Sequence, residues 1–177
     1  MCFGIFQSYQ MGREDNDILY SVLLPVRKTD VVKAKYVTTI LLQMIAFSLC
    51  AVFTGIRMAF LSNAKVYTTN ALMTANLVFL AFVLLIFTVF NVIFLGGFFK
   101  TAYRIGKPFV IFIIINFIII GIAEALHHFP GLGWLNAMDF SYAGRQIVIL
   151  AVAVIVYVVV TIASYKVSQK RFEKIDL

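Results

Sequence analysis

Residues 11–36 read MGREDNDILYSVLLPVRKTDVVKAKY and form the longest polar passage of a 177-residue chain that is otherwise mostly apolar. The stretch carries five of the fifteen basic residues and four of the eight acidic ones. Long apolar runs dominate the rest of the chain. We therefore expect this stretch to be the part that meets a partner in water.

The composition places the rest of the chain in a membrane. Hydrophobic residues make up 62% and charged residues 13% of the sequence, whereas about a quarter of a soluble domain is charged. The net charge of +7 lies in short basic clusters between apolar runs, which is how membrane proteins set their orientation. We therefore expect no nucleic-acid partner. The two cysteines, Cys2 and Cys50, have neither metal-ligand spacing nor the pattern of a disulfide framework.

A short helix is predicted from Asp17 to about Leu23. Asp15 or Asn16 can cap it, and Asp17 lies in its first turn, where the helix dipole favours negative charge. The helix has to end before Pro25, because proline disfavours helical geometry in the residue that precedes it. Its apolar residues recur at helical spacing and form a patch that some partner should cover: Ile18, Leu19, Val22 and Leu23.

A second, long helix is predicted from Asp30 to about Phe60, capped by Thr29. It is longer than a bilayer core, so its first turns belong in the headgroups and residues 37–58 form the membrane span. Tyr36 fits the aromatic belt at the membrane interface. Residues 12–35 are then a polar coupling region ahead of the span.

Three more spans follow, and the predicted fold is all-α and polytopic. Residues 1–11 are interpreted as the end of a preceding membrane helix or as a frayed amphipathic segment on the surface. Residues 166–177 form a basic tail with a helical pattern. Lipid is the solvent of the four-span domain, residues 36–165, whose later spans are predicted at 71–95, 109–126 and 147–165.

The basic residues predict the orientation of these spans. Twelve of them fall on the side that holds residues 12–35, the loop at 96–108 and the C-terminal tail. Three fall on the other side, namely Arg57, Lys65 and Arg145. The positive-inside rule then places the coupling region and both ends of the four-span domain in the cytoplasm.

Four amide side chains lie at predicted membrane depth. Such groups usually form hydrogen bonds between helices, and the alternative is that they line a translocation path. No charged residue lies near a span centre, which argues against a proton-coupled secondary transporter. The four candidates for the path are Gln43, Asn76, Asn91 and Asn116.

Glu124, His127 and His128 form the most enzyme-like cluster of the sequence. Their spacing puts them on one helical face, and a carboxylate with two imidazoles is a set of zinc ligands. The alternatives are a proton or substrate contact, or plain interfacial residues at the end of a span. Nothing resembles a phosphate-binding loop, because the Lys100-Thr101 pair lacks the preceding glycine and follows an apolar span. Any ATP must therefore bind to another polypeptide.

The run YSVLLPVRKTDVVKAKYV, residues 20–37, resembles the cytoplasmic signature of ABC-2-type transporter permeases. In that family a Leu-Pro-Val/Ile motif, basic residues and a Lys/Arg-Tyr pair precede a long span. The resemblance implies six spans in a complete subunit, with residues 1–11 ending the second. Relative to the family pattern, about 40 N-terminal residues, at some 20 residues per span, are then missing. The alternatives are that the start is misassigned, that the chain is truncated, or that the subunit is degenerate.

The resemblance also implies the function. A permease subunit of this kind dimerises with a second permease subunit, docks on an ATP-binding cassette ATPase through a coupling helix, and moves a substrate across the plasma (inner) membrane. It is not itself an enzyme and binds no cofactor, since ATP and Mg²⁺ belong to the partner. The ATPase-docking residues would be Asp17, Ile18, Leu19, Val22, Leu23, Leu24 and Pro25.

Two alternatives remain open. The apolar patch of residues 18–23 can instead lie on the membrane surface, anchored by Arg27 and Lys28 on anionic lipid. The chain can also be a non-transport membrane protein that anchors or assembles a partner complex. The function predicted from the sequence is the permease subunit of an ATP-driven exporter.

Overall fold

The computed structural model describes residues 1–177 except 24, 62–71, 102–103, 139 and 176–177, and except the side chains of Leu19 and Val22. Every regular element within this described part is helical. The predicted all-α membrane fold is therefore confirmed. In chain order the elements are α1 (Cys2–Glu14), α2 (Asp17–Leu23), α3 (Lys28–Phe60), α5 (Leu77–Phe90), the π-helical turn η1 (Asn91–Leu95), α6 (Gly96–Thr101), α7 (Gly106–Leu126), the 3-10 turns η2 (Gly133–Asn136) and η3 (Phe140–Tyr142), and α8 (Ala143–Glu173).

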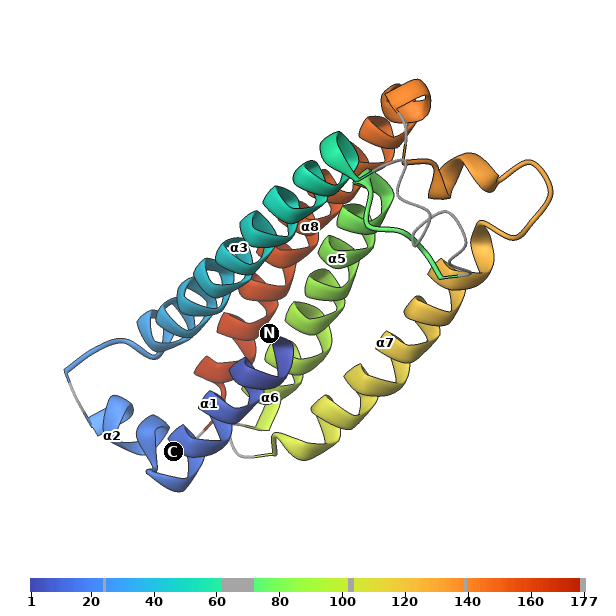
Figure 1. The fold of residues 1–177 in the computed structure, drawn as a ribbon. Helices are drawn as coiled ribbons and strands as arrows, with labels where there is room; N and C mark the ends of the chain where they lie inside the picture. The colour runs from blue at the N-terminus through green and yellow to red at the C-terminus, as the bar shows by residue number, and fades with distance from the viewer. Residues whose placement is uncertain (24, 62–71, 102–103, 139, 176–177) are drawn as a thin grey trace.

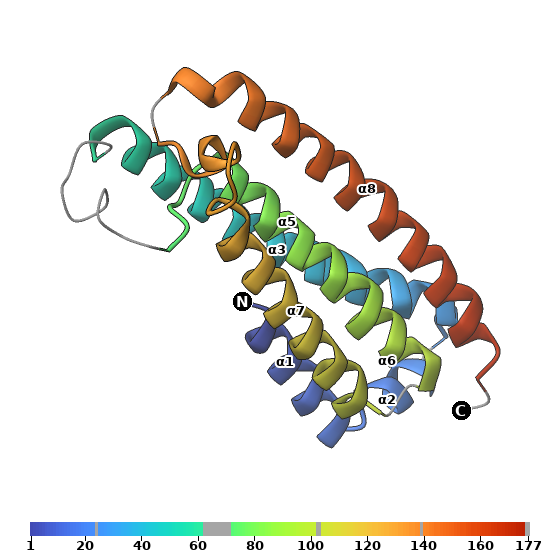
Figure 2. The same ribbon diagram turned by 90° about the vertical axis from the view of Figure 1, so that its right-hand side faces the viewer.

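Four long helical segments run side by side along one bundle axis (Figures 1 and 2). They are α3, the continuous segment α5–η1–α6, α7 and α8, and each is long and apolar enough to cross a membrane. The α5 segment is the central one, since it contacts α3, α7 and α8. Half of its most apolar 18-residue stretch is buried inside the bundle, whereas only 11–17% of the corresponding stretch is buried in each of the other three segments.

The three outer helices turn apolar faces away from the bundle. Exposed apolar side chains include Phe53 on α3, Phe117 on α7 and Ile155 on α8, each more than 60% exposed. Such an outer surface is stable only when lipid replaces water as its solvent. The chain is therefore a polytopic membrane protein.

Several helix boundaries differ from the prediction. The second span begins at Leu77 rather than at residue 71, because Asn76 caps it: the Asn76 side chain accepts a hydrogen bond from the Phe79 N–H. It also continues through Gly96-Gly97 to Thr101, since both glycines are packed inside the helical segment. α8 is continuous over 31 residues, so the last span and the helical tail are one element.

The start of α3 also differs. The helix begins at Lys28, and the extended Arg27 rather than Thr29 occupies the capping position. Asp30 lies in the first turn as predicted. The Arg27 Nε donates to Asp30 Oδ2 at 3.1 Å, so an ion pair replaces the expected hydroxyl cap.

We call the end of the bundle that holds α2, α6 and the C-terminal end of α8 the basic end. α1 lies along the half of α7 nearest to it (Figures 1 and 2). Ile5 and Tyr9 of α1 are buried, and the Phe6 ring stacks on the Phe109 ring of α7 with centroids 3.8 Å apart. α1 is therefore a packed part of the bundle and not a frayed surface segment.

Candidate functional site

The short helix α2 lies across the basic end, and its bounds are those predicted. Asn16 separates it from α1 and has a φ of 54°, a left-handed conformation that asparagine tolerates better than most residues. This residue reverses the chain between two helices within a single turn. Asp17 occupies the first turn of α2, where the helix dipole favours its charge.

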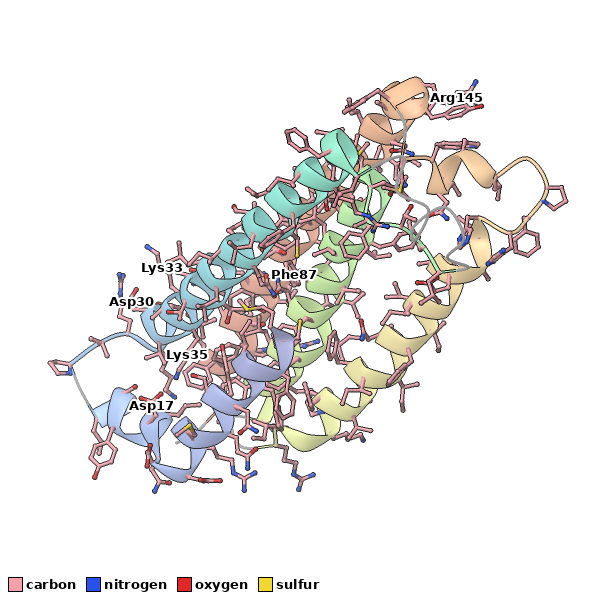
Figure 3. All side chains as sticks on the ribbon, viewed as in Figure 1. Asp17, Asp30, Lys33, Lys35, Phe87 and Arg145 are labelled. Atoms are coloured by element: carbon pink, nitrogen blue, oxygen red, sulfur yellow. The ribbon has the colours of Figure 1, made fainter. Side chains whose placement is uncertain are left out.

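Lys35 ties α2 to the two helices beside it. Its Nζ, on α3, forms an ion pair with the Asp17 carboxylate on α2. The same ammonium lies 5.4 Å from the centre of the Tyr9 ring on α1, within the range of a cation–π interaction. Figure 3 shows Lys35 and Asp17 pointing toward one another, whereas Lys33 points away from the bundle. One side chain thus connects α1, α2 and α3.

The predicted docking residues divide between two faces. Ile18 is 7% exposed and belongs to the apolar core with Val31, Val32 and Tyr36, so the prediction that it is part of an exposed patch is wrong. The amphipathic pattern was correct, but that part of it is covered by this chain's own helices. Leu23 is 79% exposed and Pro25 is also exposed. The side chains of Leu19 and Val22, and all of Leu24, lie outside the described residues.

Tyr20 joins Leu23 on the outward side of α2. It is 68% exposed, and the sequence pattern did not single it out because a tyrosine at this position also fits a membrane interface. We call Tyr20 and Leu23, together with Pro25 just beyond the helix, the outward face of α2. This face is apolar, and its helix is tied to α3 by the Lys35–Asp17 ion pair.

A network of buried polar side chains crosses the middle of the bundle. Gln43 on α3 and Asn91 on η1 exchange two amide hydrogen bonds of 2.8 and 3.1 Å. Two residues of α8 bond to the same pair: Asn91 Nδ2 donates to Thr161 Oγ1, and the Tyr157 hydroxyl donates to Gln43 Oε1. Gln43 and Asn91 are completely buried. The network therefore joins three helices through buried side chains.

The π-helical turn brings the backbone into this network. The Gly96 N–H donates to the Asn91 carbonyl five residues earlier, a widened helical turn that occurs often at functional sites. The same carbonyl accepts the Ser164 hydroxyl at 2.8 Å. The Tyr36 hydroxyl lies 2.8 Å from both Ser164 Oγ and Ser168 Oγ on α8.

Only part of this network was predictable from the sequence. Gln43 and Asn91 are brought together as the prediction of interhelical hydrogen bonds required. Tyr36 lies inside the bundle and not in an interfacial belt, because its hydroxyl has partners on α8. The other members carry hydroxyl groups, which occur so often in apolar helices that they gave no signal: Tyr157, Thr161, Ser164 and Ser168.

The other two amides lie elsewhere. Asn76 is at the end of the bundle opposite the basic end, where its Nδ2 donates to the carbonyls of Leu135 and Ala137. It caps α5 and holds the 133–137 loop, so it lies before the start of the second span and not inside it; its place in the path stays a prediction. Asn116 lies on α7, and its buried Oδ1 has no hydrogen-bond partner among the described residues.

Glu124 serves a structural contact in this structure. Its Oε2 accepts the Met73 backbone N–H at 2.6 Å. The rings of His127 and His128 lie 4.0 Å apart. Within the described residues, no group of three or more His, Cys, Asp and Glu side chains has the arrangement of a metal site.

A protein-family model described as "ABC-2 family transporter protein" matches residues 1–173. The match covers every helix of the structure, from α1 to the end of α8. No curated protein and no solved structure gave a match.

Proposed function

The chain belongs to the ABC-2 family of transporter proteins, and from this premise we propose that it is the permease subunit of an ATP-driven exporter. Family membership makes it a transmembrane transporter component that associates with an ATP-binding cassette component. The family match over residues 1–173 is the observation that carries the proposal. The coupling of transport to ATP hydrolysis on a separate subunit is the proposed step beyond it.

We assign the docking of that ATPase to the outward face of α2. Tyr20, Leu23 and Pro25 are exposed and apolar at the end of the molecule that carries most of the basic residues. An apolar face held rigidly at the water boundary is typical of a protein interface. By the positive-inside rule the basic end is cytoplasmic. We further propose the plasma (inner) membrane as the location. ATP and Mg²⁺ then bind to the partner alone.

Force from the ATPase would pass through α3. Lys35 ties α3 to α2, and the next residue, Tyr36, hydrogen-bonds to Ser164 and Ser168 on α8. Gln43 lies about two turns further along α3 and pairs with Asn91. A displacement of α2 would therefore shift α3 against α8 and strain the hydrogen bonds of the network.

The translocation path would open beside these groups, at the interface with a second permease subunit. Gln43 and Asn91 are fully paired with other side chains in this structure, so they would be reached by a substrate only after the helices move. Asn116 has an amide oxygen without a partner among the described residues. Leaving such a group unpaired costs about 1–3 kcal/mol, which a polar substrate or water would recover.

Co-purification with the ATPase tests the proposal. The wild-type chain, isolated in mild detergent, should bring with it an ATP-binding cassette subunit that hydrolyses ATP. The Leu23→Glu variant should lose most of this subunit, because the charge would have to be desolvated in an apolar contact. The matched control is Phe129→Glu, which places the same charge on an exposed residue near the opposite end of the bundle. Failure of the wild-type chain to retain any such subunit would contradict the proposal.

A further inference from the structure

A cleft of about 400 Å³ opens between the end of the α5 segment and the start of α7. Its polar lining comes from Lys100 and Thr101 on α6 and from Arg104 and Lys107 around the start of α7. Its apolar lining includes Ile93 and Ile111, which belong to two membrane-spanning segments. The cleft thus has a basic rim toward water and an apolar floor toward the membrane.

Close packing of two helices holds the cleft in shape. A Cβ atom at Gly97 would lie only 2.7 Å from the Pro108 ring of α7, so the absence of a side chain allows this approach. The Thr101 hydroxyl accepts the Arg104 N–H at 3.2 Å, which holds Arg104 beside the end of α6. Both features bring the cations of α6 and α7 to one opening.

No described residue forms an ion pair with the three cations of the cleft. None of the described residues that line the cleft is acidic. Lys100, Arg104 and Lys107 are exposed and form no ion pair within the described part of the chain. They contrast with Lys35, whose charge is paired with Asp17. Three unpaired cations above an apolar floor are complementary to an anionic headgroup that carries acyl chains.

We propose that this cleft binds the phosphate headgroup of an anionic phospholipid. Lys100, Arg104 and Lys107 contact the phosphate, and the acyl chains follow Ile93 and Ile111 along the outside of the bundle. An acidic surface of a protein would satisfy the cations but not the apolar floor at the membrane level. The proposal rests on the cleft and not on the proposed coupling to an ATPase.

Binding can be measured on the full chain in nanodiscs by native mass spectrometry, with phosphatidylglycerol or phosphatidylcholine as the probe lipid. The wild-type chain should retain phosphatidylglycerol in preference to phosphatidylcholine. Each Lys or Arg near a membrane surface contributes about fivefold to the binding of anionic lipid. The triple variant Lys100→Gln, Arg104→Gln and Lys107→Gln should therefore lose the preference by about a hundredfold.

The control is the triple variant Lys166→Gln, Lys170→Gln and Lys174→Gln, on α8 and at its C-cap. It removes the same charge from exposed residues at the same end of the molecule, and the lipid preference should survive. Equal loss in both variants would show a general charge effect and overturn the proposal. Displacement of the lipid by millimolar inorganic phosphate would do so too, because the apolar floor would then add nothing. Loss of ATPase co-purification with unchanged lipid binding in the first variant would assign the cations to the partner protein instead.

Discussion

At the scale of single residues, Lys35 has the most connected position at the basic end. The ion pair with Asp17 is partly exposed, with 27% and 42% of the two side chains accessible, so it contributes about 0.2–1 kcal/mol to stability. The cation–π contact with Tyr9 adds about 0.5–1 kcal/mol. The value of Lys35 therefore lies in fixing α2 relative to α3 more than in holding the fold.

Replacing Lys35 by methionine should free α2 while leaving the bundle folded. Spin labels at Tyr20 and Thr38, in a chain whose Cys2 and Cys50 are replaced by alanine, report the distance between α2 and α3. The distance distribution should be narrow with Lys35 and broad in the Lys35→Met variant. The Lys33→Met variant should keep the narrow distribution, since Lys33 is exposed and points away from the bundle. Equal distributions in the two variants would show that Lys35 does not hold α2.

Asn91 is the residue on which the buried network depends. The Asn91→Leu variant removes the acceptor of Gln43 Nε2 and the amide that donates to Thr161 Oγ1, and it should destabilise the chain by about 1–3 kcal/mol. Thr88→Val is the matched control, because Thr88 is also buried in the same segment, and its hydroxyl donates to the Leu84 carbonyl of its own helix. Unfolding of both variants by SDS in mixed micelles gives the comparison. A loss for Asn91→Leu no larger than for Thr88→Val would contradict this role.

At the scale of elements, η1 sets the direction of everything that follows it. One residue advances a helix by about 100°, and a π turn takes up one residue more than an α turn. Gly97 and Lys100 therefore lie about 100° from where an uninterrupted α-helix of the same sequence would put them. In this register Gly97 faces Pro108 and Lys100 faces the cleft. A regular α-helix through residues 91–95 would turn both residues away.

Deleting Val92 tests the element directly. The deletion removes the one residue that the widened turn takes up, so it should convert η1 into α-helix, keep Gly97 against Pro108 and change the melting temperature little. Deleting Leu85 in α5 leaves η1 intact and should rotate Gly97 away from Pro108 by about 100°, so it should lower the melting temperature clearly. Thermal unfolding in detergent would measure both. A loss as large for the Val92 deletion as for the Leu85 deletion would show that the π turn does not set the register.

At the scale of the whole molecule, hydropathy and charge predicted which segments lie in the membrane and which lie in water. The four long helices and the short helix at Asp17–Leu23 follow from the sequence, since apolar length and helix-capping residues are local properties. The sequence did not predict the π turn at Asn91 or the burial of Ile18. Both depend on which neighbour packs against a helix face, and an amphipathic pattern does not name that neighbour.

The same limit applies to the candidate site. Gln43 and Asn91 were predictable because amides are costly at membrane depth without a partner. Ser164, Ser168 and Thr161 were not, because a hydroxyl can bond to its own helix and needs no neighbour. Asn76 was misplaced because the boundary of its span was predicted six residues too early.

The central claim is that the outward face of α2 receives the ATPase, and photo-crosslinking from Leu23 tests it most directly. A photoreactive amino acid in place of Leu23 is irradiated in cells, and the cross-linked product is identified by mass spectrometry. We expect a covalent product with an ATP-binding cassette subunit from Leu23, and none from the same substitution at Phe129. A product with lipid alone at Leu23, or equal yields of the ATPase product at both positions, would contradict it.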